Sequence, residues 1–135
     1  MIELLEEYER PNNFVYPKAI YKLLELNITD FDVWYFMDKE SVKIRIEGFR
    51  ERYPERNLIP FARRGDCDDV ACFEIGKGEK VFIVHDFASS GWEQRKIYEN
   101  VWEWLKEVID TMIEFELIEE QYEQKSRKVT VKNSL

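Results

Sequence analysis

Three aspartates in one short polar segment are the first candidates for chemistry. Asp66, Asp68 and Asp69 lie within four positions of one another, between two apolar runs. Such a turn could hold a hard cation such as Ca²⁺, which prefers oxygen ligands. The spacing lacks the glycine and the closing glutamate of a helix–loop–helix calcium site. Because aspartates in turns usually bond their own backbone, we expect no metal and no cofactor here.

A histidine followed by an aspartate is the second candidate. His85 and Asp86 could act as an acid–base pair or as metal ligands. His85 is the only histidine, which excludes a multi-histidine site, and no serine or cysteine stands beside it in the sequence. Ser89–Gly91 is too short for a phosphate loop and lacks its lysine. We therefore predict that the chain is not an enzyme, with a small metal-dependent hydrolase as the alternative.

Aromatic and basic side chains are candidates for contacts with a protein partner. Trp92 stands in a polar loop, where it either anchors a partner or folds back onto the core. Trp34 lies in an aromatic run, which favours packing. Arg63 and Arg64 form either a recognition patch or ion pairs with the neighbouring aspartates.

Three short apolar runs in mid-chain must position these residues. Residues 58–62, 70–75 and 81–84 are rich in β-branched and aromatic side chains and are separated by polar turns, one of them with two glycines. In the last two runs neither face is polar, so both faces of the sheet need cover. The pattern predicts an α+β domain with a central, mostly antiparallel sheet packed with helices.

Helical spacing predicts the cover. The candidate helices are residues 1–10, a segment that starts at Pro17, a segment from Asp38 to Tyr53, and a long helix from Ile97 to about Ile118. On the long helix Trp102 falls on the apolar stripe and is expected in the core. Trp104 falls off it, so it either widens the stripe or lies on the surface.

Two further segments are less regular. Residues 31–37 are either a strand or a packed loop, with a strand favoured, and residues 85–95 read as a loop. The domain is expected to span residues 1–120. Residues 121–135 turn basic and are expected to form a frayed tail or a short edge strand around Val129 and Val131.

Composition narrows the classes of partner. The 135 residues carry a formal net charge of −8, which disfavours nucleic acid and favours a basic protein. No run is long enough to span a membrane, and the acidic first ten residues are unlike a signal peptide. Two cysteines, with Cys72 in a predicted strand and Cys67 in a turn, are too few for a disulfide framework. We expect a cytoplasmic protein that binds neither nucleic acid nor membrane.

The segment LIPFARRGDCDDVACFEI, followed by VFIVHDF and YENVWEWLKEVID, resembles the SUKH superfamily, the Smi–Knr-like proteins. The similarity covers about residues 31–118 and includes the upstream WYF and RYPER. It departs from the family pattern in the turn, where Arg63, Arg64 and Cys67 occupy a place that is often glycine-rich.

The resemblance implies a bacterial immunity protein, which binds and blocks a toxin domain; fungal relatives resemble scaffolding regulators of cell-wall synthesis. A basic toxin domain suits the acidic chain. We predict a non-catalytic protein-binding domain that occludes the toxin's active site, with a regulatory scaffold as a further alternative. The predicted partner-binding residues are loop acids and aromatics: Trp34, Asp66, Asp68, Asp69, Asp86 and Trp92.

Overall fold

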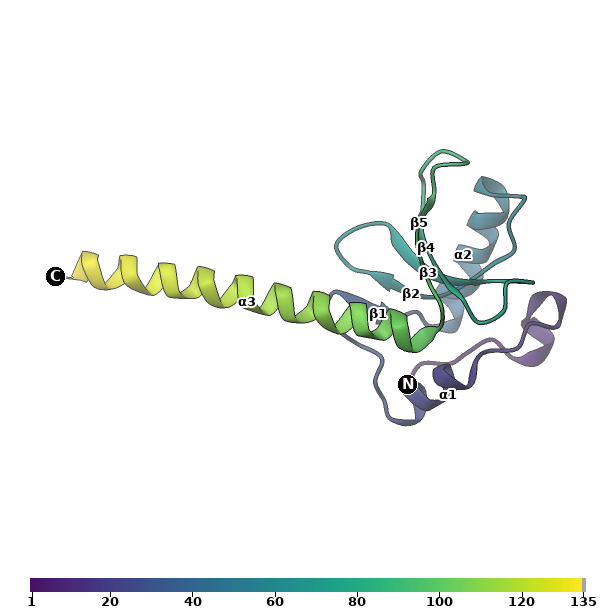
Figure 1. Cartoon of the computed structure of the whole chain (residues 1–135), viewed down its shortest axis with the longest axis horizontal. Coiled ribbons are helices and arrows are strands. Elements are labelled where there is room, and N and C mark those ends of the chain that lie inside the picture. The colour runs from purple at the N-terminus through teal and green to yellow at the C-terminus, as the bar shows by residue number, and fades with distance from the viewer. Residues whose placement is uncertain (135) are drawn as a thin grey trace.

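The computed structural model describes the backbone of residues 1–134 and the side chains of residues 1–127. Its centre is one antiparallel sheet whose strands follow one another in chain order, from β1 to β5. The strands are β1 (Trp34–Phe36), β2 (Leu58–Arg64), β3 (Asp69–Glu74), β4 (Val81–His85) and β5 (Gln94–Tyr98). Three helices pack around this sheet (Figure 1). The predicted α+β fold with a central antiparallel sheet is confirmed.

The two inner strands pair as neighbours. Ala71 of β3 lies opposite Ile83 of β4, and Cys72 lies opposite Phe82. The turn between them uses Gly76 and Gly78 at φ of 86° and 67°, a backbone conformation that glycine adopts without steric cost. Both faces of this pair are buried, as the apolar runs predict.

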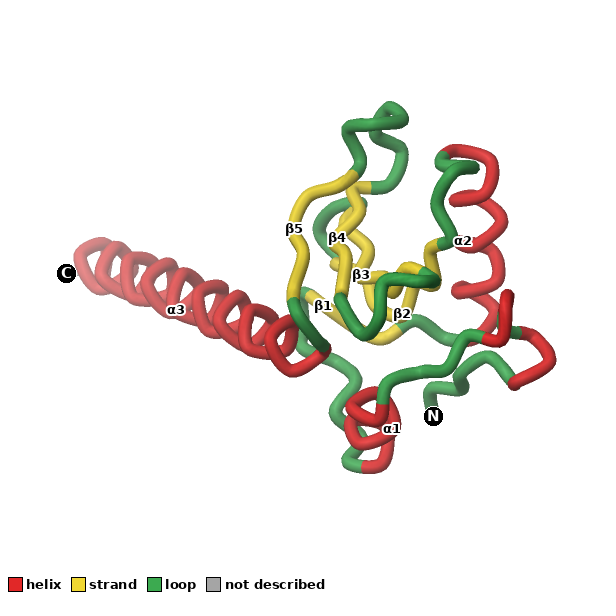
Figure 2. The backbone as a smooth tube through the Cα atoms, turned by 45° about the vertical axis from the view of Figure 1, so that its right-hand side comes forward, coloured by secondary structure: helices red, strands yellow, loops and turns green. Residues whose placement is uncertain are grey.

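Helix α2 (Lys39–Arg52) covers one face of the sheet, against β2. Its first residue follows Asp38, whose side chain accepts a 2.9 Å hydrogen bond from the Ser41 amide and so caps the helix. The stripe Val42, Ile46 and Phe49 is buried. In Figure 2 α2 and the start of α3 lie on opposite sides of the strands.

Helix α3 (Val101–Ser134) begins four residues later than predicted, because Gln94–Tyr98 forms β5 and not loop or helix. The Asn100 side chain accepts a 3.0 Å hydrogen bond from the Glu103 amide at this end. The face of α3 that packs on the body also differs from the prediction: Trp104 is 1% exposed and Trp102 is 45% exposed. The prediction that Trp102 is core is therefore wrong. Trp104 stands edge-on to Phe61, with ring centres 5.0 Å apart.

The N-terminal segment is not the predicted helix. Residues 1–10 contain only a 3₁₀ turn, Glu7–Glu9, and a second one follows at Pro11–Asn13. Leu5 is nevertheless buried, since the extended chain lies against the body. The next helix, α1 (Lys18–Glu25), starts directly after Pro17 and packs against α3.

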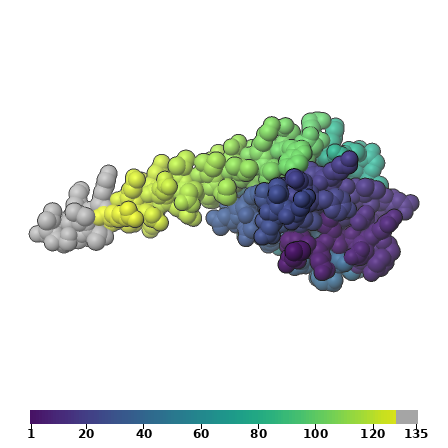
Figure 3. Space-filling model, turned by 90° about the horizontal axis from the view of Figure 1, so that it is seen from below, coloured from purple at the N-terminus to yellow at the C-terminus, as the bar shows by residue number. Residues whose placement is uncertain are grey.

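Beyond Thr111, α3 leaves the body and projects as a single rod (Figures 1 and 3). The predicted boundary between residues 120 and 121 falls inside this helix. Residues 121–134 are helical in backbone, so a frayed tail or edge strand is wrong there; the side chains of Val129 and Val131 lie outside the described residues. Along the described chain, no helix combines the length and apolar character that crossing a membrane requires.

Candidate protein-binding site

A buried carboxylate ties α2 to the loop after β4. Asp86 is 1% exposed and receives two hydrogen bonds of 2.7 Å from the guanidinium of Arg52, and one of 2.5 Å from Arg45. Burial raises the pKa of Asp86, but the hydrogen bonds from Arg52 and Arg45 outweigh it, so the pKa lies below its ordinary value. Asp86 is therefore a structural ion-pair centre. Its enclosed carboxylate disfavours the predicted contact of Asp86 with a partner.

The next residue is exposed and held in an unfavourable backbone conformation. Phe87 has a φ of 67° and is 63% exposed. Its ring packs over the guanidinium of Arg52, 4.2 Å from the ring centre, and more loosely over Arg45. A bulky residue with positive φ costs stability and is found where the surrounding structure fixes it, often at functional sites. This residue therefore marks a surface worth considering as a site.

A cavity of about 610 Å³ opens beside Phe87. It lies between α2 and the strands β1 and β2. Apolar and aromatic side chains contribute much of its wall: Ile2, Tyr35, Phe36, Met37, Ile44 and Phe87. Its size and mixed lining are typical of sites that receive a ligand or a side chain of a partner.

Charges of both signs line the same cavity. Arg45 and Arg52 reach it while holding Asp86, and Arg63 and Asp68 flank it from β2 and the following turn. Among the described residues, neither Arg63 nor Asp68 forms an ion pair; Arg63 instead lies over the Tyr35 ring at 6.0 Å. These two charges are therefore available to a partner. We call this cavity with its rim residues Ile44, Arg63, Asp68 and Phe87 the α2 pocket.

The aspartate turn is largely satisfied from within the molecule. Asp66 receives two hydrogen bonds of 2.8 Å from Arg64, and this pairing lowers its pKa. Asp69 lies 2.7 Å from Nδ1 of His85. Within the described part of the chain, no group of three histidine, cysteine or carboxylate side chains is arranged to hold a metal. Asp66 and Asp69 thus have partners within the molecule. Asp68 is the acid of this turn that lines the pocket.

The adjacent residues His85 and Asp86, considered as a possible acid–base pair, have different partners. His85 contacts Asp69 on the neighbouring strand, whereas Asp86 is held by two arginines of α2. In the described residues no serine or cysteine side chain is hydrogen-bonded to His85. The arrangement thus places an imidazole beside a carboxylate, with no hydroxyl or thiol hydrogen-bonded to it among the described residues.

The two tryptophans predicted to bind a partner have opposite positions. Trp34 is 5% exposed and stands edge-on to Trp104 at 5.7 Å, so it packs in the core, which disfavours the predicted contact with a partner. Trp92 is 77% exposed in the loop between β4 and β5. The exposed aromatic that the sequence suggested is therefore Trp92, although it is not part of the α2 pocket wall.

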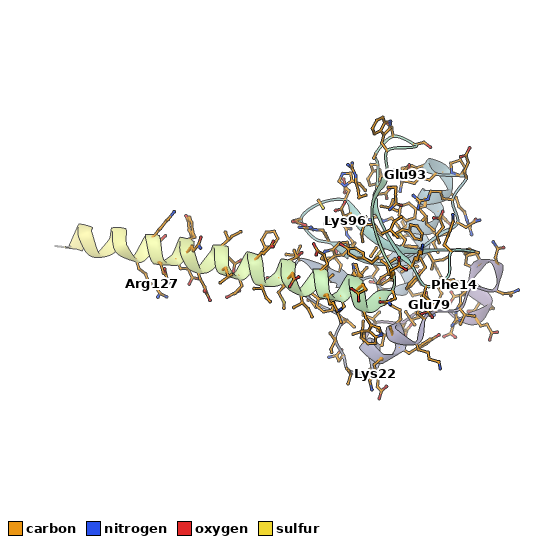
Figure 4. All side chains as sticks on the ribbon, viewed as in Figure 1. Phe14, Lys22, Glu79, Glu93, Lys96 and Arg127 are labelled. Carbon is orange, nitrogen blue, oxygen red and sulfur yellow. The ribbon has the colours of Figure 1, made fainter. Side chains whose placement is uncertain are left out.

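A second charged cluster joins the end of α2 to the sheet. Arg56 donates to Glu74 at 2.9 and 3.0 Å, to Glu93 at 3.0 Å and to Gln94 at 2.9 Å. Glu93, which is labelled in Figure 4, in turn accepts a 2.7 Å hydrogen bond from the Gly91 amide. This cluster holds the β4–β5 loop and explains why two glutamates can be partly or fully buried.

Sequence reasoning missed Ile44 and Phe87. Ile44 stands off the apolar stripe of α2, which is only a weak sequence signal for a surface contact; in the structure it is 72% exposed. Phe87 follows the His–Asp pair and reads as the end of an apolar run. No feature of the sequence shows its positive φ.

Comparison of the chain with protein-family models, curated proteins and solved structures gives no match. The SUKH resemblance therefore stays a prediction.

Proposed function

We propose that this chain is a non-catalytic protein-binding domain whose α2 pocket receives an apolar side chain of a protein partner. The observation that carries the proposal is the exposure of Phe87 and Ile44 at the rim of a cavity of about 610 Å³. Aromatic residues and arginine are the side chains that contribute most to protein interfaces, especially around a pocket. Arg63 and Asp68 supply charges that fix the orientation of the partner.

The kind of partner follows from the sequence. The SUKH resemblance implies an immunity protein, and the net charge of −8 favours attraction to a basic toxin domain. We propose that the chain acts in the cytoplasm and blocks such a toxin by covering its active site. The pairing of Asp66, Asp69 and Asp86 within the molecule moves the proposed contact from the acidic turn as a whole to the α2 pocket, with Asp68 as its acid and Trp92 as a more distant contact.

The direct test is binding of the full chain to the toxin encoded beside its gene, measured by calorimetry at low salt. Ile44→Ala and Phe87→Ala are each expected to weaken binding about tenfold or more, which corresponds to about 1.4 kcal/mol. Ile97→Ala is the matched control, because Ile97 is 53% exposed on β5 and does not line the pocket.

Two results would count against the proposal. Absence of binding at low salt would exclude the toxin as the partner and leave the regulatory scaffold as the alternative function. Equal losses for Ile44→Ala and Ile97→Ala would show that the interface lies elsewhere.

A further inference from the structure

Two arginines of α2 share one carboxylate at the wall of the α2 pocket. Arg45 and Arg52 both donate hydrogen bonds to Asp86, and both line the cavity. Their side chains are only 15 and 27% exposed. Two guanidinium groups beside one carboxylate leave one positive charge without a counter-charge. A partly buried charge of this kind is unfavourable unless an anion pairs with it.

The other acids that line the cavity do not supply this anion. Asp38 caps α2 through the Ser41 amide, and Asp68 lies in the turn after β2. Among the described residues, neither of them forms an ion pair with an arginine. The excess positive charge of Arg45 and Arg52 is therefore open to a ligand.

Both guanidinium groups also keep N–H donors that are not engaged within the described chain. Asp86 accepts from Nη1 of Arg45 and from Nε and Nη2 of Arg52. Nε and Nη2 of Arg45 and Nη1 of Arg52 have no hydrogen-bond partner among the described residues, and none of these three atoms is fully buried. A ligand that enters the cavity can therefore accept from them. A guanidinium binds a carboxylate well, because its planar N–H groups match the two oxygens.

Gly48 determines where the Arg52 guanidinium lies. A glycine inside a helix is less stable than an alanine, so its presence in α2 calls for a reason. A Cβ at position 48 would stand 2.4 Å from Nη2 and 2.9 Å from Nη1 of Arg52, too close for non-bonded atoms. The missing side chain thus leaves the space in which the guanidinium rests at the cavity wall, with the Phe87 ring centre 4.2 Å from it.

We propose that Arg45 and Arg52 form a carboxylate-binding subsite of the α2 pocket, into which the protein partner inserts an aspartate or glutamate next to its apolar anchor. This inference rests on the proposed function, because it names a second side chain that the partner brings. A carboxylate balances the single excess charge, whereas a phosphate dianion exceeds it. Ile44 and Phe87 at the rim accept the neighbouring apolar side chain. The attraction between a basic domain and the acidic chain acts over a longer range, so it does not conflict with this local contact.

A pair of capped dipeptides tests the subsite without the toxin. Acetyl-Leu-Glu-amide and acetyl-Leu-Gln-amide are nearly equal in size and differ in charge, and NMR titration of the full chain measures their binding. The glutamate peptide is expected to shift the amide signals of Ile44 and Phe87 and to bind about tenfold more tightly than the glutamine peptide. The amide signal of Ile97, which does not line the pocket, is expected to stay in place.

Three results of this titration would overturn the proposal. They are equal binding of the two peptides, no binding of the glutamate peptide up to about 20 mM, and tighter binding of inorganic phosphate than of the glutamate peptide at the same signals.

Arg45→Gln removes the excess charge and leaves the paired hydrogen bonds between Arg52 and Asp86, so we expect the fold to be kept. This variant is expected to lose the preference for the glutamate peptide. Arg50→Gln is the matched control, because it removes the same charge from an exposed position of the same helix that does not line the α2 pocket. Near-ultraviolet circular dichroism verifies the fold of both variants. A preference that survives Arg45→Gln, or that Arg50→Gln abolishes equally, overturns the proposal.

Gly48→Ala is a second variant, and it keeps both arginines. The added methyl group must displace the Arg52 guanidinium, which is the end of a long flexible side chain, so α2 is expected to form as before. Binding of the glutamate peptide is expected to weaken about threefold or more, and binding of the glutamine peptide to stay the same. Unchanged binding of the glutamate peptide would overturn the role of Gly48.

The subsite and the proposed function can fail separately. Toxin binding by a chain that does not prefer the glutamate peptide would overturn the subsite and support the proposed function. A clear preference for the glutamate peptide without toxin binding would support the subsite and exclude the toxin as the partner.

Discussion

Arg52 in the last turn of α2 grips Asp86, the residue after β4, with two parallel hydrogen bonds of 2.7 Å. Bidentate pairs of this kind are among the stronger charged contacts in proteins. The pair joins elements that are 34 residues apart in the chain, and Arg45 adds a third hydrogen bond to the same carboxylate. It also sets the platform on which the Phe87 ring rests. The stability of the α2 pocket thus depends on a single buried carboxylate.

Replacement of that carboxylate is expected to be costly. Asp86→Asn leaves two arginines without their counter-charge, and we expect a loss of about 2–4 kcal/mol in the free energy of unfolding. The loss is smaller than for a fully buried pair because both arginines reach solvent in part. Urea denaturation measures it. Asp68→Asn, at an exposed aspartate, is the control and is expected to change stability by less than about 0.5 kcal/mol; similar losses for both variants would contradict the role of Asp86.

The two tryptophans of α3 are expected to respond differently to truncation. Trp104→Ala removes a side chain that contacts Phe36, Phe61 and Trp34, and should cost about 3–5 kcal/mol. Trp102→Ala, two residues away and 45% exposed, should cost less than about 1 kcal/mol. Thermal and urea unfolding of the two variants measure the difference. The reverse order would mean that α3 packs with the face that the sequence pattern first suggested.

Acid is expected to weaken the attachment of the N-terminal segment. Hydrogen bonds from Lys43 and from the Glu6 backbone lower the pKa of Glu9 from 4.5 to about 2. Because the folded pKa is the lower one, this contribution to stability is complete above about pH 4.5 and is lost as the pH falls toward 2. Glu9→Gln is expected to lower the free energy of unfolding at neutral pH. It should also make the decrease in this free energy between pH 4.5 and 2 smaller.

Urea denaturation at a series of pH values tests the assignment. Glu7→Gln is the control, because Glu7 forms no ion pair among the described residues. If the free energy of unfolding of Glu9→Gln falls as steeply below pH 4.5 as that of the wild type, other carboxylates, such as Asp86, cause the fall.

Divalent cations are expected to leave the melting temperature unchanged. The acids of the central turn are bound to Arg64 and His85, so a cation would have to displace these partners. Thermal unfolding with Ca²⁺, Mg²⁺, Mn²⁺ and Zn²⁺ is the measurement. A site filled at a hundred times its dissociation constant would add about 2.7 kcal/mol. Stabilisation of that size by one cation would revive the metal-dependent hydrolase.

The inner sheet could be predicted from the sequence because its strands are apolar on both faces and are bounded by clear turns. The same reasoning missed β5, since Gln94–Tyr98 is an edge strand with mostly exposed, charged side chains that carry no apolar alternation. The N-terminal apolar spacing fitted a helix, but Leu5 reaches the core from an extended segment, held by Arg10 and Glu9. Tertiary contacts outweighed local propensity there.

The site was less predictable than the fold because it depends on contacts between distant segments. Nothing near Asp86 in the sequence indicates that Arg45 and Arg52 will enclose it. Asp86 was therefore predicted as a surface acid, although it is the centre of a buried ion-pair cluster. Trp92 could be recognised from its polar surroundings. The rim of the α2 pocket could not be recognised, because Ile44 and Phe87 line one cavity only in the folded chain, in which α2 packs on β2.

The order of the strands has a consequence for how quickly the chain finds its native state. The strands β2, β3 and β4 each pair with the strand that follows in sequence through a short loop, so these hairpins close first at small entropic cost. β1 is the exception, because α2 is inserted between it and β2. We expect refolding to begin at the β2–β3 hairpin, whose loop (residues 65–68) is the shortest of the three, and to end with α2 and β1 docking together, which makes closure of the α2 pocket the final event of folding.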